Sequence, residues 1–348
     1  MKIAVMLSGG VDSAAAAHLL KRGGADITCF TLRLFDDDEF GFPVGSGMQK
    51  QIEKAKFIAE KLELPHKIID FRKEFKKEIV SYFFEKYQKG MTPNPCIECN
   101  FKIKWGEALE YIKKKGFQKI ASGHYATLIF NDKKYKVYNS KDESKDQTYL
   151  LWQLNQYQLK NMLFPLQAYK KPQIIDMMNT EYGMNSQAES QDICFIYKDY
   201  RSLLKQFFGK QKRGDVIFDK KKIGEHSGCF NYTIGQRRGL NLPHRSPFYV
   251  KNIDINTNKV FITDDIKELY FKQFFIKNIN WINGVQPKCK TLFVKIRYKT
   301  TAKKVKKLIP KKDGLLVKME QRIKSPTFGQ SAVFYQKNQL MGGGIISP

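Results

Sequence analysis

Long apolar runs and acidic side chains are both scarce in this sequence of 348 residues. No stretch reaches the roughly 18 to 20 apolar residues that a membrane-spanning helix needs, and the apolar run at residues 3–7 is too short for the core of a signal peptide. We therefore expect a cytoplasmic protein without a membrane contact. Only 34 Asp and Glu accompany 61 Lys and Arg, a formal net charge of +27, so nucleic acid is the first partner to consider.

Cysteine is sparse as well, with six residues in the chain, which excludes a scaffold held together by disulfides. The composition, with 42% hydrophobic and 27% charged residues, is that of a folded globular protein and not of a disordered chain. At about 100 to 200 residues per domain, the length predicts two or three domains.

The first part of the chain alternates short apolar runs with helical patterns. The run at residues 3–7 is typical of a strand buried on both faces, and the Ala- and Leu-rich stretch 13–22 predicts a helix that ends at Gly23. Strands alternating with helices imply right-handed crossovers and a doubly wound parallel sheet. Further strands are expected at residues 27–34, 66–71 and 119–122.

After about residue 200, short strands and Gly-containing turns replace the helical stripes. We predict an α/β domain over residues 1–200, a small linking domain over 201–274, and a C-terminal β-barrel over 275–348 in which residues 331–335 close the set of strands. Residues 286–312 contain eleven Lys or Arg and no Asp or Glu, which makes them the best electrostatic footprint for a polyanion, although single lysines there can equally be a solvated face.

The hexapeptide Ser-Gly-Gly-Val-Asp-Ser at residues 8–13 lies between the first predicted strand and the first helix. Backbone N–H groups and the helix dipole favour phosphate at such a junction, and Asp12 can hold a divalent cation such as Mg²⁺. The Walker pattern is absent, because no Gly-Lys-Ser/Thr ends the loop. A glycine turn is common at any strand-to-helix junction, but six suitable residues in this context favour a nucleotide site.

Two thiols, Cys96 and Cys99, follow the stiff sequence Thr-Pro-Asn-Pro at residues 92–95. A helix N-terminus next to them would depress a thiol pKa. A redox pair and half of a structural zinc site are the alternatives, but zinc would need a second Cys or His pair at matching spacing, which the sequence lacks. Cys194 has polar residues on one side and apolar ones on the other, and by itself it would be interpreted as a small buried hydrophobe. The other three thiols belong to no motif and are interpreted as packing residues: Cys29, Cys229 and Cys289.

The hexapeptide resembles the pyrophosphatase loop of the ATP pyrophosphatases, which amidating ligases and tRNA-thiolating enzymes share. Taken with five other motifs in family order, nearly the whole chain resembles the tRNA-specific 2-thiouridylases of the MnmA type. The resemblance implies an α/β fold with a doubly wound parallel sheet, like that of the adenine nucleotide alpha hydrolases, followed by a linking domain and a barrel. The five motifs are Thr-Pro-Asn-Pro with Cys99 and Asn100, Ser-Gly-His-Tyr-Ala at 122–126, Lys-Asp-Gln at 145–147, residues 190–195, and Tyr-Thr-Ile-Gly-Gln-Arg-Arg-Gly-Leu at 232–240.

This resemblance implies an ATP-dependent sulfurtransferase that forms 2-thiouridine at the wobble position of tRNA. ATP adenylates the C2 oxygen, Cys194 carries the persulfide, and Cys99 is the nucleophile that closes a transient disulfide with Cys194 as AMP leaves. Thiolate attack, delivery of a persulfide sulfur and disulfide formation suit these residue types. The implied partners are tRNA for Lys, Glu and Gln, and a cysteine desulfurase or sulfur-relay protein. We expect a monomer, because no separate interaction helix stands out in the sequence.

The resemblance also assigns roles to other residues. For one of these residues, His124, a packed or capping histidine is the alternative to the implied contact with tRNA. ATP contacts are implied for Met6, Leu7, Ser8, Gly9, Gly10, Val11, Asp12, Ser13, Leu32 and Gly123. Contacts with the target base are implied for Asn94, Pro95 and Cys96, and contacts with tRNA for His124, Lys145, Asp146, Gln147, Arg297, Tyr298 and Gln330.

Two positions depart from the family pattern: Leu32 stands where many members have Met, and Cys96 where many have Asp. With Cys99 and Cys194, Cys96 could give three thiolates to an iron–sulfur cluster that leaves one iron open, and this alternative remains beside the main one. Two other functions are alternatives that the sequence disfavours. A small-molecule ATP pyrophosphatase or amidating ligase would need neither the thiol pair nor the large positive net charge. A non-catalytic RNA-binding protein would need neither the loop nor the thiols.

Overall fold

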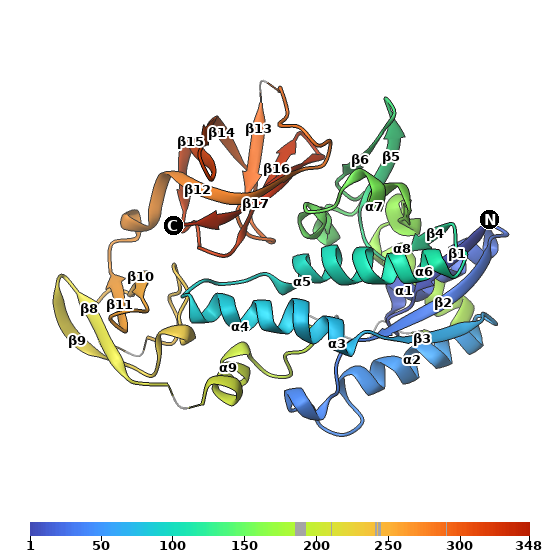
Figure 1. Ribbon diagram of the computed structural model, residues 1–348, viewed down its shortest axis with the longest axis horizontal. Coiled ribbons are helices and arrows are strands. Elements are labelled where there is room, and N and C mark those ends of the chain that lie inside the picture. Colours follow the sequence, from blue (N-terminus) through green and yellow to red (C-terminus); the bar gives the residue numbers. More distant parts are fainter. Residues whose placement is uncertain (185–192, 210, 241, 243–244, 290) are drawn as a thin grey trace.

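Three sheets organise the computed structural model, which describes residues 1–184, 193–209, 211–240, 242, 245–289 and 291–348 (Figure 1). An α/β unit holds the N-terminus, a small four-stranded sheet lies at the opposite end of the molecule, and a barrel lies above the helices that join them. No helix in the described part of the chain is long and apolar enough to cross a membrane.

The α/β unit is a parallel sheet with strand order β3-β2-β1-β4-β7. Ile3, Val5 and Leu7 pack against one set of helices, whereas Ala4 and Met6 face the other set, so the sheet is buried on both sides as predicted. The strands are β1 (Lys2–Met6), β2 (Asp26–Arg33), β3 (His66–Asp70), β4 (Lys119–Ala121) and β7 (Met162–Leu163).

Helices cover both faces of this sheet. One face carries α1 (Val11–Arg22), α2 (Gly47–Lys61) and α8 (Lys171–Tyr182). The other face carries two long helical runs, each containing a π-helical stretch, a rare form that is frequent at functional sites. These runs are α3 (Arg72–Phe75), η2 (Lys76–Val80) and α4 (Ser81–Gln88), and then α5 (Pro95–Glu98), η3 (Cys99–Glu107) and α6 (Ala108–Lys114).

The architecture changes after residue 200, as expected. Helix α9 (Tyr200–Phe208) leads to a small sheet with strand order β10-β11-β8-β9 around Val216, Val250 and Val260. Its strands are β8 (Gly214–Phe218), β9 (Lys221–His226), β10 (Tyr249–Asp254) and β11 (Lys259–Thr263). The short helices of the chain are α7 (Gln156–Lys160), η1 (Asp38–Phe40), η4 (Glu143–Lys145), η5 (Thr148–Leu151), η6 (Pro165–Ala168), η7 (Cys229–Asn231) and η8 (Ile266–Leu269).

Six C-terminal strands form the predicted barrel, but residues 331–335 are not in the last of them, because another strand follows at Gln339–Ser347. The closing pair is the last strand with the first, for example Ile346 opposite Ile276. A hairpin from the α/β unit, β5 (Thr127–Asn131) and β6 (Lys134–Tyr138), extends the same sheet, because Val137 pairs with Leu340. The barrel strands are β12 (Tyr270–Trp281), β13 (Leu292–Lys295), β14 (Lys303–Lys311), β15 (Gly314–Lys324), β16 (Ser331–Gln336) and β17 (Gln339–Ser347).

Candidate active site

The loop between β1 and α1 is tied into a compact turn by Ser13. Its hydroxyl accepts a hydrogen bond from the Ser8 N–H (3.1 Å) and donates one to the Gly10 carbonyl (2.8 Å). Gly9 has φ of +78°, and a Cβ there would lie 2.7 Å from the Gln51 carbonyl oxygen, so only glycine fits. The loop therefore leaves backbone N–H groups at the start of α1 open to a phosphate.

Gly123, at the end of β4, lies directly against this loop. A Cβ on Gly123 would be 2.6 Å from the Asp12 carbonyl carbon and 2.8 Å from the Ser13 nitrogen. Strand β1 lies between β2, which carries the half-buried Leu32, and β4, so the predicted ATP residues meet at one edge of the sheet. The chain leaves β1 toward β2 and later returns to β4, and such a switch point is where open α/β sheets bind ligands.

The carboxylate of Asp12 is already paired. The Lys171 ammonium lies 2.6 and 2.7 Å from its two oxygens, and the Tyr125 hydroxyl donates to Oδ1 at 2.8 Å. Lys171 is buried, and its backbone N–H donates to Asp142 (2.9 Å), which fixes the start of α8. Sequence reasoning missed Lys171, since a Lys-Pro pair before a helical stripe is no specific signal.

The three predicted thiols lie on two neighbouring segments. Cys96 is half-buried in α5, Cys99 begins η3 and is buried, and Cys194 is exposed on a turn closed by the hydrogen bond from the Ile196 N–H to the Ile193 carbonyl (2.9 Å). Exposure of Cys194 contradicts its interpretation from local sequence as a buried hydrophobe. Residues 190–192 of its motif lie outside the described residues.

Burial controls the acidity of these thiols. It raises the pKa of Cys99 to about 11 and also raises the pKa of Cys96, so the expected lowering by a helix N-terminus is outweighed. The pKa of Cys194 is raised too, and desolvation is the largest cause, although the residue as a whole is exposed. The nearby Cys99 and Cys96 raise it further. Cys96 also raises the pKa of Cys99, and the Lys104 cation on η3 opposes the rise at each of the three thiols.

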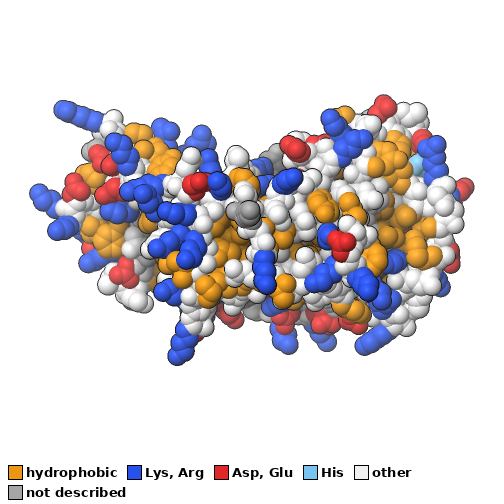
Figure 2. All heavy atoms as spheres, turned by 90° about the horizontal axis from the view of Figure 1, so that it is seen from above, with side chains coloured by type: hydrophobic (Ala, Val, Ile, Leu, Met, Phe, Trp, Pro, Cys, Tyr) orange, Lys and Arg blue, Asp and Glu red, His pale blue; other side chains and the backbone are white. Residues whose placement is uncertain are grey.

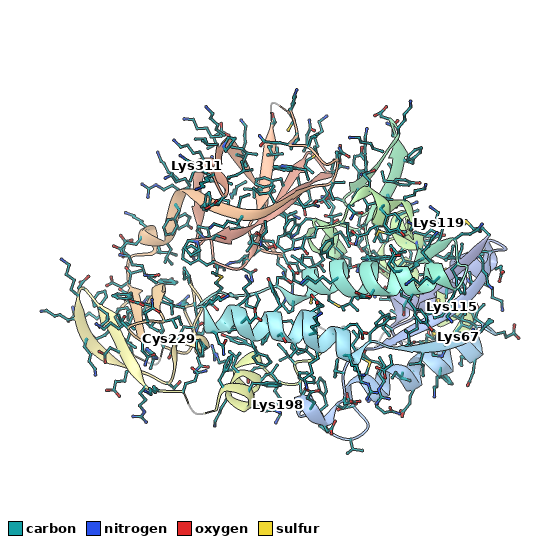
Figure 3. All side chains as sticks on the ribbon, viewed as in Figure 1. Lys67, Lys115, Lys119, Lys198, Cys229 and Lys311 are labelled. Carbon is teal, nitrogen blue, oxygen red and sulfur yellow. The ribbon has the colours of Figure 1, made fainter. Side chains whose placement is uncertain are left out.

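A metal centre does not fit this arrangement. Across the described ranges, no group of three or more His, Cys, Asp or Glu side chains is placed to hold a metal ion. Cys96, Cys99 and Cys194 therefore do not form a ligand set for an iron–sulfur cluster. The remaining thiols agree with packing roles: Cys29 and Cys229 are buried, and Cys289 packs against the barrel core. Cys229 lies in the small sheet region (Figure 3).

The segment before Cys96 is held by both β domains. The Thr92 N–H donates to the Phe328 carbonyl (2.8 Å), and the Gln330 amide donates to the Thr92 carbonyl (2.9 Å). The Thr92 hydroxyl also lies 3.3 Å from that of Thr233. Asn94, Pro95 and Cys96, the predicted contacts of the target base, therefore follow a point where loops of the α/β unit, the small-sheet unit and the barrel meet.

Several predicted tRNA residues have partners within the protein. Arg297 donates to the carbonyls of Ile234 (3.1 Å) and Ser325 (3.2 Å) and to the Thr327 hydroxyl (2.9 Å), which links the barrel to the small domain. Tyr298 lies beside Tyr149, with ring centroids 5.9 Å apart. Their contacts with tRNA remain predictions.

The loop of residues 145–147 is also internally bonded. Buried Asp146 accepts hydrogen bonds from the Ser140 N–H (3.0 Å) and the Thr148 hydroxyl (2.7 Å), and its pKa is raised by burial. The Gln147 amide oxygen accepts from the Tyr125 N–H (2.9 Å), while Lys145 ends η4. These contacts fix the loop beside Tyr125, the residue that also donates to Asp12.

His124 is half-buried and lies beside two aromatic rings, and its contact with tRNA remains a prediction. Its Nδ1 lies 2.7 Å from the Ser122 hydroxyl, and its ring is 6.1 Å from those of Trp105 and Phe164. Burial, assisted by the Lys104 cation, lowers the pKa of His124 to about 3, so the imidazole is neutral at physiological pH.

Basic side chains cover the outer surface of the barrel. Lysines 303, 304, 306, 307 and 311 of β14 are exposed, and Lys304 pairs with Glu320 (3.0 Å). Lys311 extends from the outer side of the barrel (Figure 3), and Lys and Arg side chains are spread over the face in Figure 2. The β14 part of the predicted basic footprint is thus exposed to solvent, and its contact with tRNA remains a prediction.

The fold and the site together define a nucleotide-binding protein of the ATP pyrophosphatase class with two added β domains. Family models match residues 1–198 (tRNA methyl transferase HUP domain), 201–264 (tRNA methyl transferase PRC-barrel domain) and 271–346 (aminomethyltransferase beta-barrel domain). The chain belongs to the family of the tRNA-specific 2-thiouridylases MnmA.

Curated relatives match from end to end. The chain is 37% identical to the tRNA-specific 2-thiouridylase MnmA of Clostridium kluyveri, with 99% of both chains covered, and 40% identical to that of Treponema denticola, with 99% and 98% covered. A solved 4-thiouridine synthetase–RNA complex with bound ATP is 16% identical to this chain, with a TM-score of 0.33. The match covers 59% of this chain and 50% of that one.

Proposed function

We propose that this chain is an ATP-dependent tRNA sulfurtransferase that forms 2-thiouridine at the wobble position. The observation that carries the proposal is the presence in one chain of a built phosphate loop and of two thiols, Cys99 and Cys194, on segments that pack into the same hydrophobic core. Membership of the 2-thiouridylase family over 99% of the chain supports the same reaction.

The reaction uses ATP to activate the uridine. The C2 oxygen attacks the α-phosphorus, pyrophosphate leaves, and the oxygen becomes part of an AMP leaving group. The loop of residues 8–13 holds the phosphates through backbone N–H groups, and Lys171 is close enough to neutralise their charge once it leaves Asp12. Asp12 would hold Mg²⁺, which neutralises phosphate charge when bound.

Sulfur transfer then takes two steps. The terminal sulfur of the Cys194 persulfide attacks C2 and expels AMP, which links tRNA to Cys194 through two sulfur atoms. The Cys99 thiolate attacks the Cys194 sulfur and breaks the S–S bond, so the outer sulfur stays on C2 as the thiocarbonyl. The Cys99–Cys194 disulfide remains and is reduced by an external thiol before the next cycle.

Other parts of the proposal rest on the family resemblance. The substrates are tRNA for Lys, Glu and Gln, and the sulfur comes from a cysteine desulfurase or a relay protein. The chain has three domains, over residues 1–200, 201–274 and 275–348: the first binds ATP and carries the catalytic thiols, and the two β domains bind tRNA. The three segments matched by family models support this division. The monomeric state and the cytoplasmic location remain predictions.

The decisive test is nucleoside mass spectrometry of unmodified lysine tRNA after incubation with the protein, ATP, Mg²⁺, cysteine and a cysteine desulfurase. We expect ATP-dependent 2-thiouridine with the native chain and none with Cys194→Ala, which should still bind ATP and tRNA. Thiolation by Cys194→Ala would contradict the sulfur route. AMP formation without any thiolated nucleoside would support the assigned ATP site but contradict the assigned tRNA substrate or sulfur donor.

A further inference from the structure

A group of phenylalanine rings packs under the turn that carries Cys194. Phe195 is 1% exposed, and its ring contacts those of Phe40 (5.5 Å between centroids), Phe75 (5.6 Å) and Phe83 (5.4 Å). The interplanar angles of 67°, 80° and 84° make all three contacts edge-to-face. Each such pair contributes about 0.5–1.5 kcal/mol beyond the burial of area, so the ring is firmly held.

The three partner rings come from different elements of the site. Phe40 belongs to η1, in the segment that follows β2; Phe75 ends α3; and Phe83 lies in α4. Helix α4 leads directly to the segment of residues 89–94 and the thiols of α5 and η3. Phe195 thus joins its own turn to the helical runs on the face of the sheet that carries Cys99.

The turn separates the two neighbouring side chains. Cys194 and Phe195 occupy its two central positions, between Ile193 and Ile196, whose backbone hydrogen bond closes it (2.9 Å). Phe195 is buried in the core, whereas Cys194 is exposed. Fixing the phenylalanine therefore also fixes the residue next to it, which keeps an exposed position in the turn.

We propose that Phe195 is a positioning residue for sulfur transfer: its ring anchors the Cys194 turn so that the Cys194 sulfur stays within reach of Cys99. For the sulfur chemistry this inference rests on the proposed function. The anchor acts through the effective concentration of one thiol at the other, which governs the rate of their reaction once Cys194 carries the transferred sulfur. In this proposal Phe195 acts through the position of Cys194 and takes no part in the sulfur chemistry itself.

The test measures formation of the Cys99–Cys194 disulfide in a glutathione redox buffer, with the cross-linked peptide quantified by mass spectrometry separately from any disulfide of Cys96. We expect Phe195→Ala to lower the effective concentration of the pair at least tenfold. Phe207→Ala is the matched control, because Phe207 stacks on Phe84 (4.1 Å) at the rim of the same cluster, is 39% exposed and lies outside the turn. The control should stay within twofold of the native chain.

A second variant separates positioning from folding. Phe195→Leu keeps an apolar side chain in the core but removes the edge-to-face contacts, so we expect a folded protein by thermal melting and about a threefold lower effective concentration. The anchor is rejected if folded Phe195→Leu matches the native chain, or if Phe207→Ala and Phe195→Ala fall equally.

Kinetics of thiolation give an independent readout. Phe195→Leu should lower kcat with the KM for ATP unchanged, because the phosphate loop is untouched; a raised KM with native kcat would contradict positioning. If the native chain makes no 2-thiouridine while the disulfide assay still separates Phe195→Leu from Phe207→Ala, the anchor stands and the proposed function fails. If thiolation works and the disulfide assay shows no difference, the function stands and the anchor fails.

Discussion

Replacing Gly123 by alanine should damage ATP binding through a single added methyl group. That Cβ would lie 2.6 and 2.7 Å from the carbonyl carbon and oxygen of Asp12, and 2.8 Å from the nitrogen of Ser13. All three are backbone atoms at the start of α1, so no flexible side chain can move aside. The phosphate loop itself has to shift.

Overpacking of this kind costs about 1–3 kcal/mol. Because the displaced backbone is the part that holds phosphate, we expect the cost to appear as about 5- to 150-fold weaker ATP binding. Isothermal titration calorimetry with a non-hydrolysable ATP analogue measures this directly, and thermal melting checks that the variant is folded.

Gly23→Ala is the control for the same chemical change. Gly23 follows the other end of α1 with φ of −76°, and a Cβ there would be 3.4 Å from the Leu19 carbonyl oxygen, an ordinary contact. Its ATP affinity should equal that of the native chain. A folded Gly123→Ala protein that binds ATP within twofold of native affinity would refute the close packing of Gly123 on the phosphate loop.

Three further changes test other parts of the site. Lys171→Met should lower tRNA-dependent AMP formation at least tenfold, measured by chromatography, with tRNA binding unchanged; native AMP formation would exclude a role in phosphate binding. Since burial raises the pKa of Cys99 to about 11, its thiolate fraction and alkylation rate, followed by peptide mass spectrometry, should rise about tenfold per unit from pH 7 to 10; a plateau at pH 8 would contradict this. Changing Lys306 and Lys307 to Gln should flatten the log–log salt dependence of tRNA binding by about 0.7–0.9 per lost phosphate contact, and an unchanged slope would show a solvated face.

Local patterns in the sequence predicted the local structure well. The apolar run at residues 3–7 became β1 with both faces buried, and the hexapeptide became the loop at the start of α1. These succeeded because a buried strand, a helix stripe and a glycine loop each impose a short-range pattern on the residues that form them. The meeting of Gly123 with the loop followed from the family resemblance.

Contacts between distant segments had no such signal. Val137 pairs with Leu340 across about 200 positions, and nothing near either residue announces the pairing of the hairpin with the barrel. Lys171 reaches Asp12 from the start of a helix 159 residues away, and only the folded chain reveals the ion pair. The prediction of a lowered pKa for Cys99 was wrong for a different reason. The helix N-terminus can be predicted from the sequence, whereas the desolvation that outweighs its effect depends on the whole surrounding core.

The two thiols differ in exposure. That difference supports the proposed roles of Cys194 as the persulfide carrier and Cys99 as the nucleophile independently of the family resemblance. A protein that delivers sulfur has to reach the acceptor thiol from outside, and Cys194 is exposed whereas Cys99 is buried. Cys99 needs only to reach the sulfur on Cys194, and its buried position shields the thiol from oxidants in bulk solvent. If the roles were exchanged, the donor would have to open the core to load the buried Cys99. An exposed Cys194 and a buried Cys99 therefore fit the proposed order of events, in which Cys194 is loaded with sulfur first and Cys99 reacts second.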